Sequence, residues 1–515
     1  MSRPAKLQFT ASHVACDRWP GGTALLRRLG AGNVPEGLPL FDAQAAGLPP
    51  DPTGLDRDRL ARRLVAVNRS LGNPLDAPTV DAIRGGAFFI VTGQQPGLLG
   101  GPAYTLLKAV TAVQHARRLS QRLAATVLPA FWIAAEDHDL AEVDHCTIAG
   151  TTLRCPPDSN ATNSGRSPVN DVPLEPCRDR IIASIDALPD HARCEADLAA
   201  IVRGIDWSSY TTQFASALRA MLGDVPLVLL EPMRMRDVLA PALSQVVARA
   251  DAMPEAFDAG RALLQGQGFE PQLQEVGLFE ITGNVRRRTQ LRPGVAQQVL
   301  DEPERFSPGA ALRPIVQDAA LPVLCTIGGP GEMMYLWQIG PLYEAVGVRR
   351  SAIWPRLSAT VVDPATRELA DRFDLPAERI LQAAERLRAF DPLANANALP
   401  HVRRMQQQGE ELMQAIDACA PVGDQVVERA RRSIRYQVRK IAAHLAHQKR
   451  EQQGVGRSQL RRVADAVMPR GQPAERVVAG LDWFGRFGPA LVEHLLTEAD
   501  VSRIVHHLIE VRTQP

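Results

Sequence analysis

The sequence predicts an α/β protein with a Rossmann-like parallel-sheet core, inserted subdomains and a C-terminal antiparallel helical coiled-coil arm. Short apolar, β-prone runs alternate with helical patterns, which is typical of a parallel sheet. Two intervals, 136–224 and 231–321, are longer than a single crossover helix needs, which indicates insertions. The last third of the chain changes to long stretches with helical spacing, which indicates the arm.

Five apolar runs are expected to form the strands of the core. They lie at residues 87–92, 125–134, 225–230, 322–327 and near 351–354. A helical pattern at 103–119 follows the first run across a glycine-rich turn, and Pro102 suits its first position because proline's missing N–H costs nothing there. The segments 146–155 and 278–291 have the pattern of short β insertions.

Two apolar rows with helical spacing predict the arm. One row runs from Val402 to Cys419 and the other from Val427 to Leu445, with a turn at 421–424 between them, so the two helices should lie antiparallel. Such an arm packs against a partner or against its own chain. We expect four parts: a helical and loop segment at 1–85, the core at 86–375 with insertions near 140–220 and 260–318, the coiled-coil hairpin at 376–455, and a C-terminal helical segment at 456–515 that returns to the core.

Composition excludes several classes of protein. The 58 Lys and Arg residues nearly balance the 57 Asp and Glu residues, a net charge of +1 that argues against a nucleic-acid binder. No apolar run approaches 18 residues, so we expect no membrane span, and the first residues lack the apolar stretch of a secretory signal. The seven cysteines are odd in number and form no CxxC pair, which argues against a disulfide framework. Free thiols would fit a cytoplasmic location.

The glycine-rich turn after the first strand is a candidate anion site. It would lie where open parallel sheets bind ligands, and exposed N–H groups at a helix N-terminus favour a phosphate or carboxylate. It is neither a Walker A loop nor GxGxxG, and a tight turn that simply needs small residues is the alternative. Lys108 lies two turns into the following helix and is one of only four lysines, so it could supply a compact positive charge or be merely solvated. The candidate cofactor-binding residues are Thr92, Gly93, Gln94, Gln95, Gly97, Gly100 and Gly101.

An acidic segment follows the second strand. Glu136, Asp137, His138 and Asp139 are consecutive, and carboxylates beside an imidazole can supply a general base near neutral pH. Two other interpretations compete. Asp139 and Glu142 fit a helix capping box. Alternatively, His138, Glu142 and His145 have i, i+4, i+7 spacing and could share a helical face as metal ligands, although without a complete ligand set we expect no metal.

A third group of candidates surrounds the fourth and fifth strands. A turn, GGPGE, follows the fourth strand, and its glycines would allow a ligand to approach the backbone closely. Glu332 could line the same cleft or could compensate a helix dipole, and Arg356 could bind a substrate carboxylate or form a surface salt bridge. The candidate substrate-binding residues are Trp132, Glu136, Arg313, Gln317, Gly328, Gly329, Glu332, Tyr335, Gln338 and Arg356.

Five segments together resemble a known family. They are VTGQQPGLLGGPAYTLLKA, FWIAAEDHDLAEVDH, FSPGAALRPIVQD, LPVLCTIGGPGEMMYLWQ and WPRLSAT, and in this order they resemble the bacillithiol biosynthesis cysteine-adding enzymes. The late segment MPRGQPAERV is similar to that family's ending, and the resemblance covers about residues 87–490. Two positions depart from the family, since it usually has Asn in place of Gly309 and Gln in place of Ala474.

The resemblance implies a cytoplasmic ligase that joins cysteine to glucosaminyl-malate and forms the thiol bacillithiol. It also implies a Rossmann-like core and a coiled-coil arm used for homodimerisation, with no nucleic-acid or membrane partner. Because amide formation from a free carboxylate requires activation, we expect ATP as co-substrate. From position and chemistry we assign anion binding to the glycine-rich loop and Lys108. We assign proton transfer to Asp137 and His138, and binding of the malate carboxylates to Arg313 and Arg356.

Two other functions fit parts of the same pattern. One is a nucleotidylyl-transferase-like enzyme on the same scaffold, which would consume ATP and leave a stable nucleotide-linked product. The other is a non-catalytic dimeric scaffold that works through its arm, for which the glycine-rich loop would be dispensable.

Overall fold

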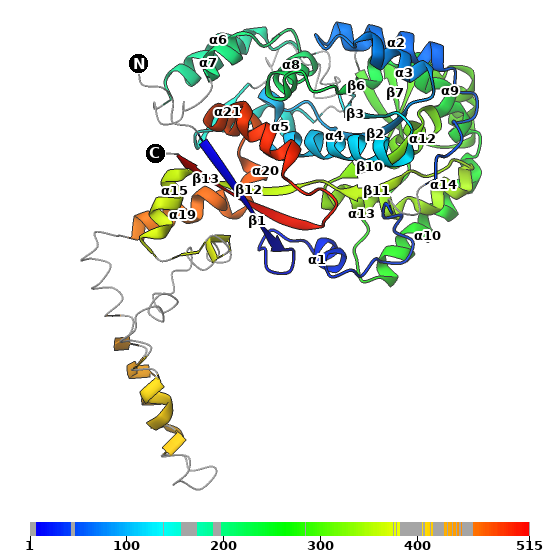
Figure 1. Ribbon diagram of the computed structural model, residues 1–515. Coiled ribbons are helices and arrows are strands. Elements are labelled where there is room, and N and C mark those ends of the chain that lie inside the picture. Colours follow the sequence, from blue (N-terminus) through cyan, green and yellow to red (C-terminus); the bar gives the residue numbers. More distant parts are fainter. Residues whose placement is uncertain are drawn as a thin grey trace.

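The core is a parallel sheet of five strands (Figure 1). The computed structural model describes residues 7–42, 47–136, 139–155, 172–188, 197–283, 285–373, 375–376, 379–381, short pieces between 404 and 444, and 457–513. The strands, in spatial order, are β11 (Ala352–Pro355), β10 (Val323–Gly328), β2 (Phe88–Gln94), β3 (Val127–Ile133) and β6 (Val228–Leu230). All five strands predicted from apolar runs are therefore present and lie in one sheet.

Both faces of this sheet are buried, which explains why its strands are continuously apolar. In β2, Phe88 and Ile90 pack in a cluster with residues of α4 (Ala103–Leu123), whereas Phe89 and Val91 belong to a second hydrophobic cluster. Because successive side chains of a strand point to opposite faces, the two clusters cover opposite sides of the sheet. A strand buried on both sides lacks the polar alternation of an exposed sheet.

The strand order reverses beside β2. From β2 the chain proceeds to β3 and then to β6 in one direction, and later it places β10 and β11 on the other side of β2. Open α/β sheets bind ligands at such a reversal, in the crevice beyond the carboxyl ends of the strands. The fold therefore predicts a site between the ends of β2 and β10.

Helices surround the sheet and fill the intervals between its strands. α4 packs on β2 and β3, and α21 packs on α4 and α8. Before and beside the core lie α1 (Ala24–Gly30), α2 (Arg57–Ser70), α3 (Ala77–Arg84), α8 (Tyr210–Leu222), α9 (Arg236–Val247), α10 (Met253–Gly266), α12 (Arg313–Ala320), α13 (Pro330–Gln338) and α14 (Gly340–Val346). Towards the C-terminus lie α15 (Pro364–Asp371), α19 (Arg457–Val467), α20 (Ala474–Val477) and α21 (Gly480–Thr497).

The expected β insertions are present. The first contains α5 (Leu140–Val143), β4 (His145–Ile148), β5 (Thr151–Arg154), α6 (Glu175–Asp186) and α7 (Leu198–Arg203), and the second contains β7 (Gly277–Thr282), β8 (Val285–Gln290), α11 (Pro293–Asp301) and β9 (Phe306–Pro308). A disulfide joins Cys155 to Cys177 in the first insertion. The expectation of free thiols was wrong for this pair, because β5 and α6 bring together two cysteines that are 22 residues apart. The argument from free thiols to a reducing compartment therefore loses its support.

A second sheet joins the two ends of the described chain. β13 (Val505–Thr513) lies between β1 (Leu7–Ala15), to which it is antiparallel, and β12 (Ser358–Val362), to which it is parallel. We expected only helices and loops in the first 85 residues and a helical ending after 456. These two strands differ from that expectation because they form by pairing across almost the whole chain, which no local pattern reveals.

The arm lies mostly outside the described residues, and the pieces of it that are described are helical. They project away from the body in Figure 1. A Cβ placed on Gly409 would lie 3.6 Å from Cγ2 of Val438, so the two predicted helices lie side by side at this level. Leu412 and Ile441 are 52% and 47% exposed. The predicted turn at 421–424 falls outside the described residues.

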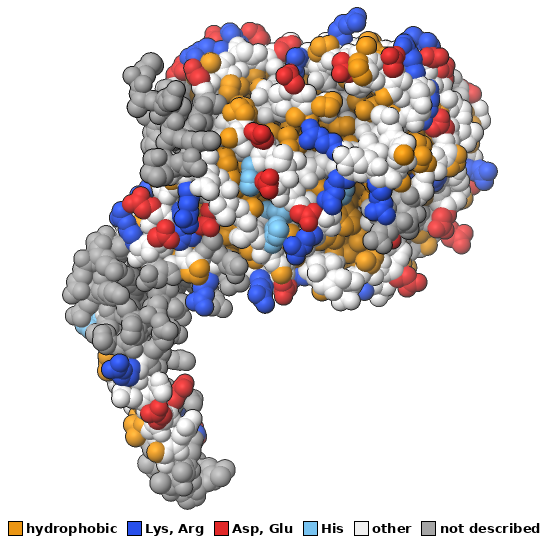
Figure 2. All heavy atoms as spheres, in the orientation of Figure 1, with side chains coloured by type: hydrophobic (Ala, Val, Ile, Leu, Met, Phe, Trp, Pro, Cys, Tyr) orange, Lys and Arg blue, Asp and Glu red, His pale blue; other side chains and the backbone are white. Residues whose placement is uncertain are grey.

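The surface agrees with the balanced charge of the chain. On the face in Figure 2, acidic and basic side chains are interspersed. Among the described residues, no helix has both the length and the apolar character needed to cross a bilayer.

Candidate active site

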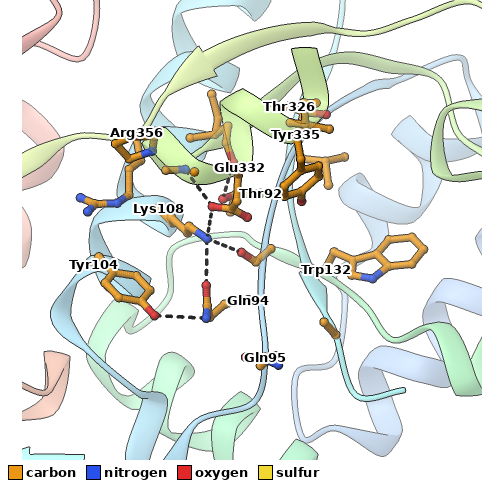
Figure 3. A pocket seen from close by; sticks show the side chains of 18 of the residues that line it. Thr92, Gln94, Gln95, Tyr104, Lys108, Trp132, Thr326, Glu332, Tyr335 and Arg356 are labelled. Atoms are coloured by element: carbon orange, nitrogen blue, oxygen red, sulfur yellow. Dashed lines mark hydrogen bonds and ion pairs between the residues drawn. The ribbon is translucent and has the colours of Figure 1, made fainter. Parts of the chain in front are cut away.

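A cavity of about 460 Å³ opens where the strand order reverses (Figure 3). The ends of β2, β3 and β10 form its floor, and α4, α12 and α13 contribute side chains to its walls. Twelve of the predicted site residues line it: Thr92, Gly93, Gln94, Gln95, Lys108, Trp132, Arg313, Gln317, Gly329, Glu332, Tyr335 and Arg356. The structure thus unites residues of the segment 92–108 with residues of the segment 313–356, more than 200 positions further along the chain.

Lys108 holds the floor of the cavity together. Its ammonium donates to the backbone oxygen of Gly93 at 2.7 Å and to Oε1 of Gln94 at 2.9 Å, and it pairs with Oε2 of Glu332 at 2.6 Å. Three acceptors occupy the three protons of the ammonium, and the side chain is only 2% exposed. Burial lowers the pKa of Lys108, and the Glu332 carboxylate opposes that shift. Lys108 therefore joins β2 to α13 and is not the solvated lysine that we considered.

The glycine at the end of β2 is required by a close approach. Gly93 pairs with Trp132 of β3 in the sheet, and a Cβ at position 93 would lie 2.9 Å from the backbone oxygen of Trp132. A larger residue would push the two strands apart at the cavity floor. The same residue offers its carbonyl to Lys108, so its position affects the floor directly.

Arg313 lines the cavity from the start of α12. Its guanidinium donates to Oε1 of Gln317 at 3.1 Å and to the hydroxyl of Tyr335 at 3.5 Å, and it lies 5.5 Å from the ring centre of Trp132. Burial raises the pKa of the Tyr335 phenol, so Tyr335 stays neutral beside this cation. Within the described part of the chain, no carboxylate lies within ion-pair distance of Arg313.

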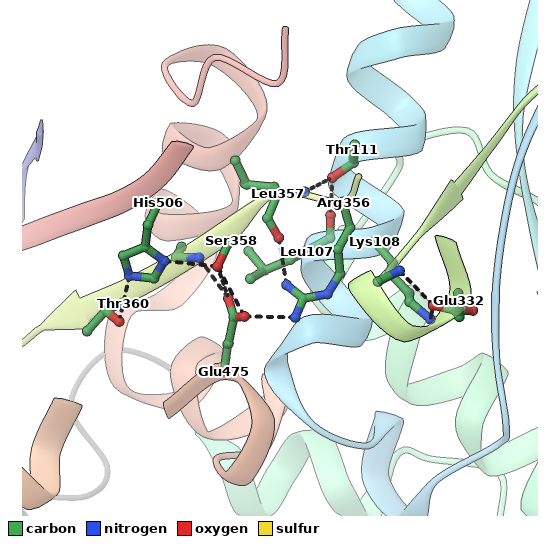
Figure 4. A network of polar contacts seen from close by, with 12 residues as sticks. Leu107, Lys108, Thr111, Glu332, Arg356, Leu357, Ser358, Thr360, Glu475 and His506 are labelled. Atoms are coloured by element: carbon green, nitrogen blue, oxygen red, sulfur yellow. Dashed lines mark hydrogen bonds and ion pairs between the residues drawn. The ribbon is translucent and has the colours of Figure 1, made fainter. Parts of the chain in front are cut away.

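Arg356 forms an ion pair with Glu475 of α20 (Figure 4). Its Nη2 donates to Oε1 of Glu475 at 2.7 Å, and both side chains are buried. Glu475 also accepts from Ser358 Oγ at 3.1 Å and from the Ala359 N–H at 2.8 Å. Burial raises the pKa of Glu475, but Arg356 and these donors outweigh it, so the pKa lies below its ordinary value. Arg356 therefore lines the cavity with its charge balanced by Glu475, and its ion pair is buried and not on the surface as we considered.

The same network continues into the second sheet. Nδ1 of His506 lies 2.9 Å from Ser358 Oγ, and its Nε2 lies 2.9 Å from Thr360 Oγ1. Trp19 stacks on the imidazole with ring centres 4.0 Å apart. Burial lowers the pKa of His506 to about 3, so the ring is neutral. The network connects the cavity wall to β12 and β13.

Several lining residues were not predicted as site residues, and three of them are Tyr104, Glu142 and Arg476. Tyr104 accepts a hydrogen bond from Gln94 at 3.2 Å, and its i, i+4 relation to Lys108 on one helix face could have revealed it. Glu142 lines the cavity although we considered it only for capping or metal binding. Arg476 comes from α20, and no local signal in the sequence connects it with β2.

The second half of the glycine-rich loop does not belong to the cavity. Gly97, Gly100 and Gly101 are absent from its lining, because Leu98 and Leu99 turn into the core and are fully buried. The loop N–H groups are also occupied. Those of Gly97, Gly100 and Gly101 bond to carbonyls within the loop, and that of Leu99 bonds to Gln213 Oε1. The predicted phosphate cradle was therefore wrong for these three glycines.

Three other predicted residues face elsewhere. Gln338 accepts from the N–H groups of Gln272 and Leu273, and thus fixes a neighbouring segment. Glu136 lies 3.9 Å from Arg236 at a separate small cavity. Gly328 does not line the site, although its carbonyl accepts from the Arg356 N–H.

The acidic segment is only partly described. Asp137 and His138 fall outside the described residues, so their roles stay predictions. Asp139 caps α5 by accepting from the Ala141 N–H. The interpretation of Glu142 and His145 as metal ligands on one helical face is wrong, because α5 ends at Val143 and His145 already belongs to β4. No group of potential metal ligands was found in the part of the chain that the structure describes.

Comparison with known proteins gives consistent matches over nearly the whole chain. The family model "Bacillithiol biosynthesis BshC, N-terminal Rossmann-like domain" matches residues 41–357, and "Bacillithiol biosynthesis BshC, C-terminal coiled-coil domain" matches 359–511. A relative from Koribacter versatilis is 30% identical over 475 residues, covering 86% of this chain and 88% of its own. One from Symbiobacterium thermophilum is 30% identical over 505 residues, covering 89% and 90%. Each carries the name "Putative cysteine ligase BshC".

Proposed function

Because the chain belongs to the bacillithiol biosynthesis BshC family, we propose that it is an amide-forming ligase that adds cysteine to glucosaminyl-malate. The observation that carries this proposal is the charge of the cavity at the strand reversal. Its described lining contains the basic residues Lys108, Arg313, Arg356 and Arg476 and the acidic residues Glu142 and Glu332. Both substrates bring carboxylates, and an excess of cations in a partly enclosed site favours them.

The reaction would form a bond between the carboxyl carbon of cysteine and the amine nitrogen of the glucosamine unit. One carboxyl oxygen must leave, and a free carboxylate is a poor acceptor, so we propose ATP as the co-substrate that activates it. Transfer of a phosphoryl or adenylyl group to the carboxylate would allow that oxygen to leave with phosphate or with AMP when the amine attacks. The glycine-rich loop does not suit the ATP phosphates, since the N–H groups of Gly97, Leu99, Gly100 and Gly101 already bond within the protein. We therefore assign no step to that loop.

The side chains of the cavity suit positioning. Arg313 would bind a substrate carboxylate, and its guanidinium is oriented by Gln317 and Tyr335. Glu142 would pair with a substrate ammonium, since Glu332 is already paired with Lys108. Holding the amine near the activated carboxyl raises the effective concentration of the two reactants. The proton of that ammonium must be removed before attack, and Asp137 and His138 remain our candidates for this step.

The test is to incubate the protein with cysteine, glucosaminyl-malate and ATP and to identify the product by mass spectrometry. We expect the mass of the amide, and no product when ATP is omitted. Arg313→Gln should reduce product formation at least tenfold, since a lost charge-assisted contact costs about 1.5–3 kcal/mol. Arg305→Gln is the matched control, because it removes a half-exposed arginine that directly precedes β9 and does not line the cavity. Failure of the unmodified protein to form the amide would reject the proposal.

A further inference from the structure

The four cations in the described lining of the cavity fall into two classes. Lys108 is neutralised by Glu332 at 2.6 Å and Arg356 by Glu475 at 2.7 Å. For Arg313, no ion pair with any described residue is found. Arg476 likewise has no carboxylate within ion-pair distance among the residues described. Two of the four positive charges are thus balanced within the protein, and two remain available to a ligand.

Arg476 is exposed, but its backbone is fixed. Its neighbour Glu475 is 1% exposed and is bonded to Arg356, Ser358 and Ala359. On the other side, the carbonyl of Val478 accepts from the Ala103 N–H at the start of α4. The short helix α20 is therefore attached at both sides of Arg476. A guanidinium on a fixed backbone loses less freedom on binding than one on a mobile loop.

The two unbalanced cations come from different elements that meet at one cavity. Arg313 belongs to α12 and Arg476 to α20, and both side chains line the same space. Glu142 at the exposed rim is the one lining carboxylate, among those described, that is not already paired with a cation. Arg313 and Arg476 can thus bind two negative groups of one ligand, while Glu142 remains for an ammonium of the substrate.

We infer that Arg313 and Arg476 together bind a dianionic substrate group, and that Arg476 is a specificity residue for it. The class is a dicarboxylate or a doubly charged phosphate, both of which a guanidinium can bind through two parallel hydrogen bonds. That the dianion is the malyl group rests on the proposed function, because a malate attached through its hydroxyl keeps both carboxylates free.

Calorimetric titration with L-malate and, separately, with inorganic phosphate tests this inference without requiring turnover. Arg476→Ala should weaken binding of the recognised dianion about 10- to 100-fold, and Arg476→Lys should be intermediate because a lysine cannot form the paired bonds. Arg470→Ala is the matched control, since it removes the same charge from an exposed arginine that bonds to Thr152 outside the cavity. Its affinity should equal that of the unmodified protein.

The two probes distinguish the sources of the dianion. A loss confined to malate supports the site and identifies a dicarboxylate, and a loss confined to phosphate supports the site and identifies a phosphate group. Equal affinities for the Arg476→Ala and unmodified proteins, or no binding of either probe, would overturn the inference.

Product formation separates this inference from the proposed function. If the unmodified protein forms the amide and Arg476→Ala leaves the KM for glucosaminyl-malate unchanged, the dianion site fails and the ligase stands. If no amide forms but malate binding depends on Arg476, the site stands and the ligase fails.

Discussion

Glu475→Gln should destabilise the protein and distort the cavity wall, because it removes the charge that balances a buried cation. The side chains of Arg356 and Glu475 are 5% and 1% exposed, and their nitrogen and oxygen atoms lie 2.7 Å apart. Glutamine has nearly the same shape as glutamate, so it creates no large void. It can still accept from the Ala359 N–H, but Arg356 is left buried without a counter-charge.

The magnitude follows from this burial. Breaking a buried ion pair by removing one partner costs about 3–5 kcal/mol in the free energy of unfolding, mostly because an unbalanced charge stays buried. The entropy of unfolding is about 2.1 cal/mol/K per residue, so a chain of 515 residues has about 1 kcal/mol per degree. If the whole chain unfolds cooperatively, Glu475→Gln should therefore lower Tm by about 3–5 °C. If a smaller unit unfolds, its entropy of unfolding is smaller and the decrease in Tm should be larger.

Calorimetry of three proteins tests this reasoning. The second variant, Arg356→Met with Glu475→Gln, removes the unbalanced charge and should recover much of the lost stability, although each change alone is unfavourable. Glu475 positions Arg356, a candidate for binding the malate carboxylates. Glu475→Gln should therefore also raise the KM for glucosaminyl-malate more than the KM for cysteine. A Tm within 1 °C of the unmodified protein, or a double variant less stable than Glu475→Gln, would refute the argument.

Three further predictions concern the arm, the acid stability and the floor of the cavity. Deleting 402–450 should convert a dimer into monomers by light scattering, since the apolar rows exceed what one thin hairpin can bury; an unchanged dimer would contradict this. Burial lowers the pKa of His115 and His507 to about 4 and of His506 to about 3, against an ordinary value of 6.5. As pH falls below 6.5 the unfolded chain binds protons that the folded chain does not, so each histidine removes about 1.4 kcal/mol of stability per pH unit. The urea midpoint of unfolding should fall as the pH falls, and its dependence on pH should be weaker for His115→Phe. An equal dependence would show that His115 does not contribute to the loss of stability. Lys108→Arg should lower both Tm and turnover, since a larger guanidinium in a fully occupied site costs about 1–3 kcal/mol of overpacking; unchanged values would show that the three contacts of Lys108 are dispensable.

The central sheet could be predicted because its strands carry their own signal. A parallel strand covered on both faces is apolar at nearly every position, as Phe88–Gln94 is over its first four residues. The outer strands carry no such signal. In β13 two adjacent histidines, His506 and His507, are buried. His506 contacts Trp19 and Ser358, and His507 packs edge-on against His13, so their partners come from distant parts of the chain. Such burial depends on partners that no window of the sequence contains.

Part of the cavity lining could be predicted for the same reason, whereas the roles of its residues stay predictions. Residues at the ends of predicted strands lie in the cavity because parallel strands present their carboxyl ends at one edge. The glycine-rich loop misled us, since four glycines and an expected helix suggested an anion cradle. The two leucines at its centre were the contrary signal, because they are fully buried and draw the chain into the core. Arg476 had no signal, since its relation to the cavity arises only from tertiary structure.

The two family models divide the chain beside the cavity, and the contacts cross that division. The first model ends at residue 357 and the second begins at 359, yet Arg356 belongs to one and its counter-charge Glu475 to the other. Arg476 likewise enters the cavity of the first region from the second. Cutting between the regions would expose Arg356 without its partner and remove one of the two unbalanced cations. The C-terminal region is thus part of the wall of the site as well as the bearer of the arm, so a change that displaces α20 would alter the cavity directly.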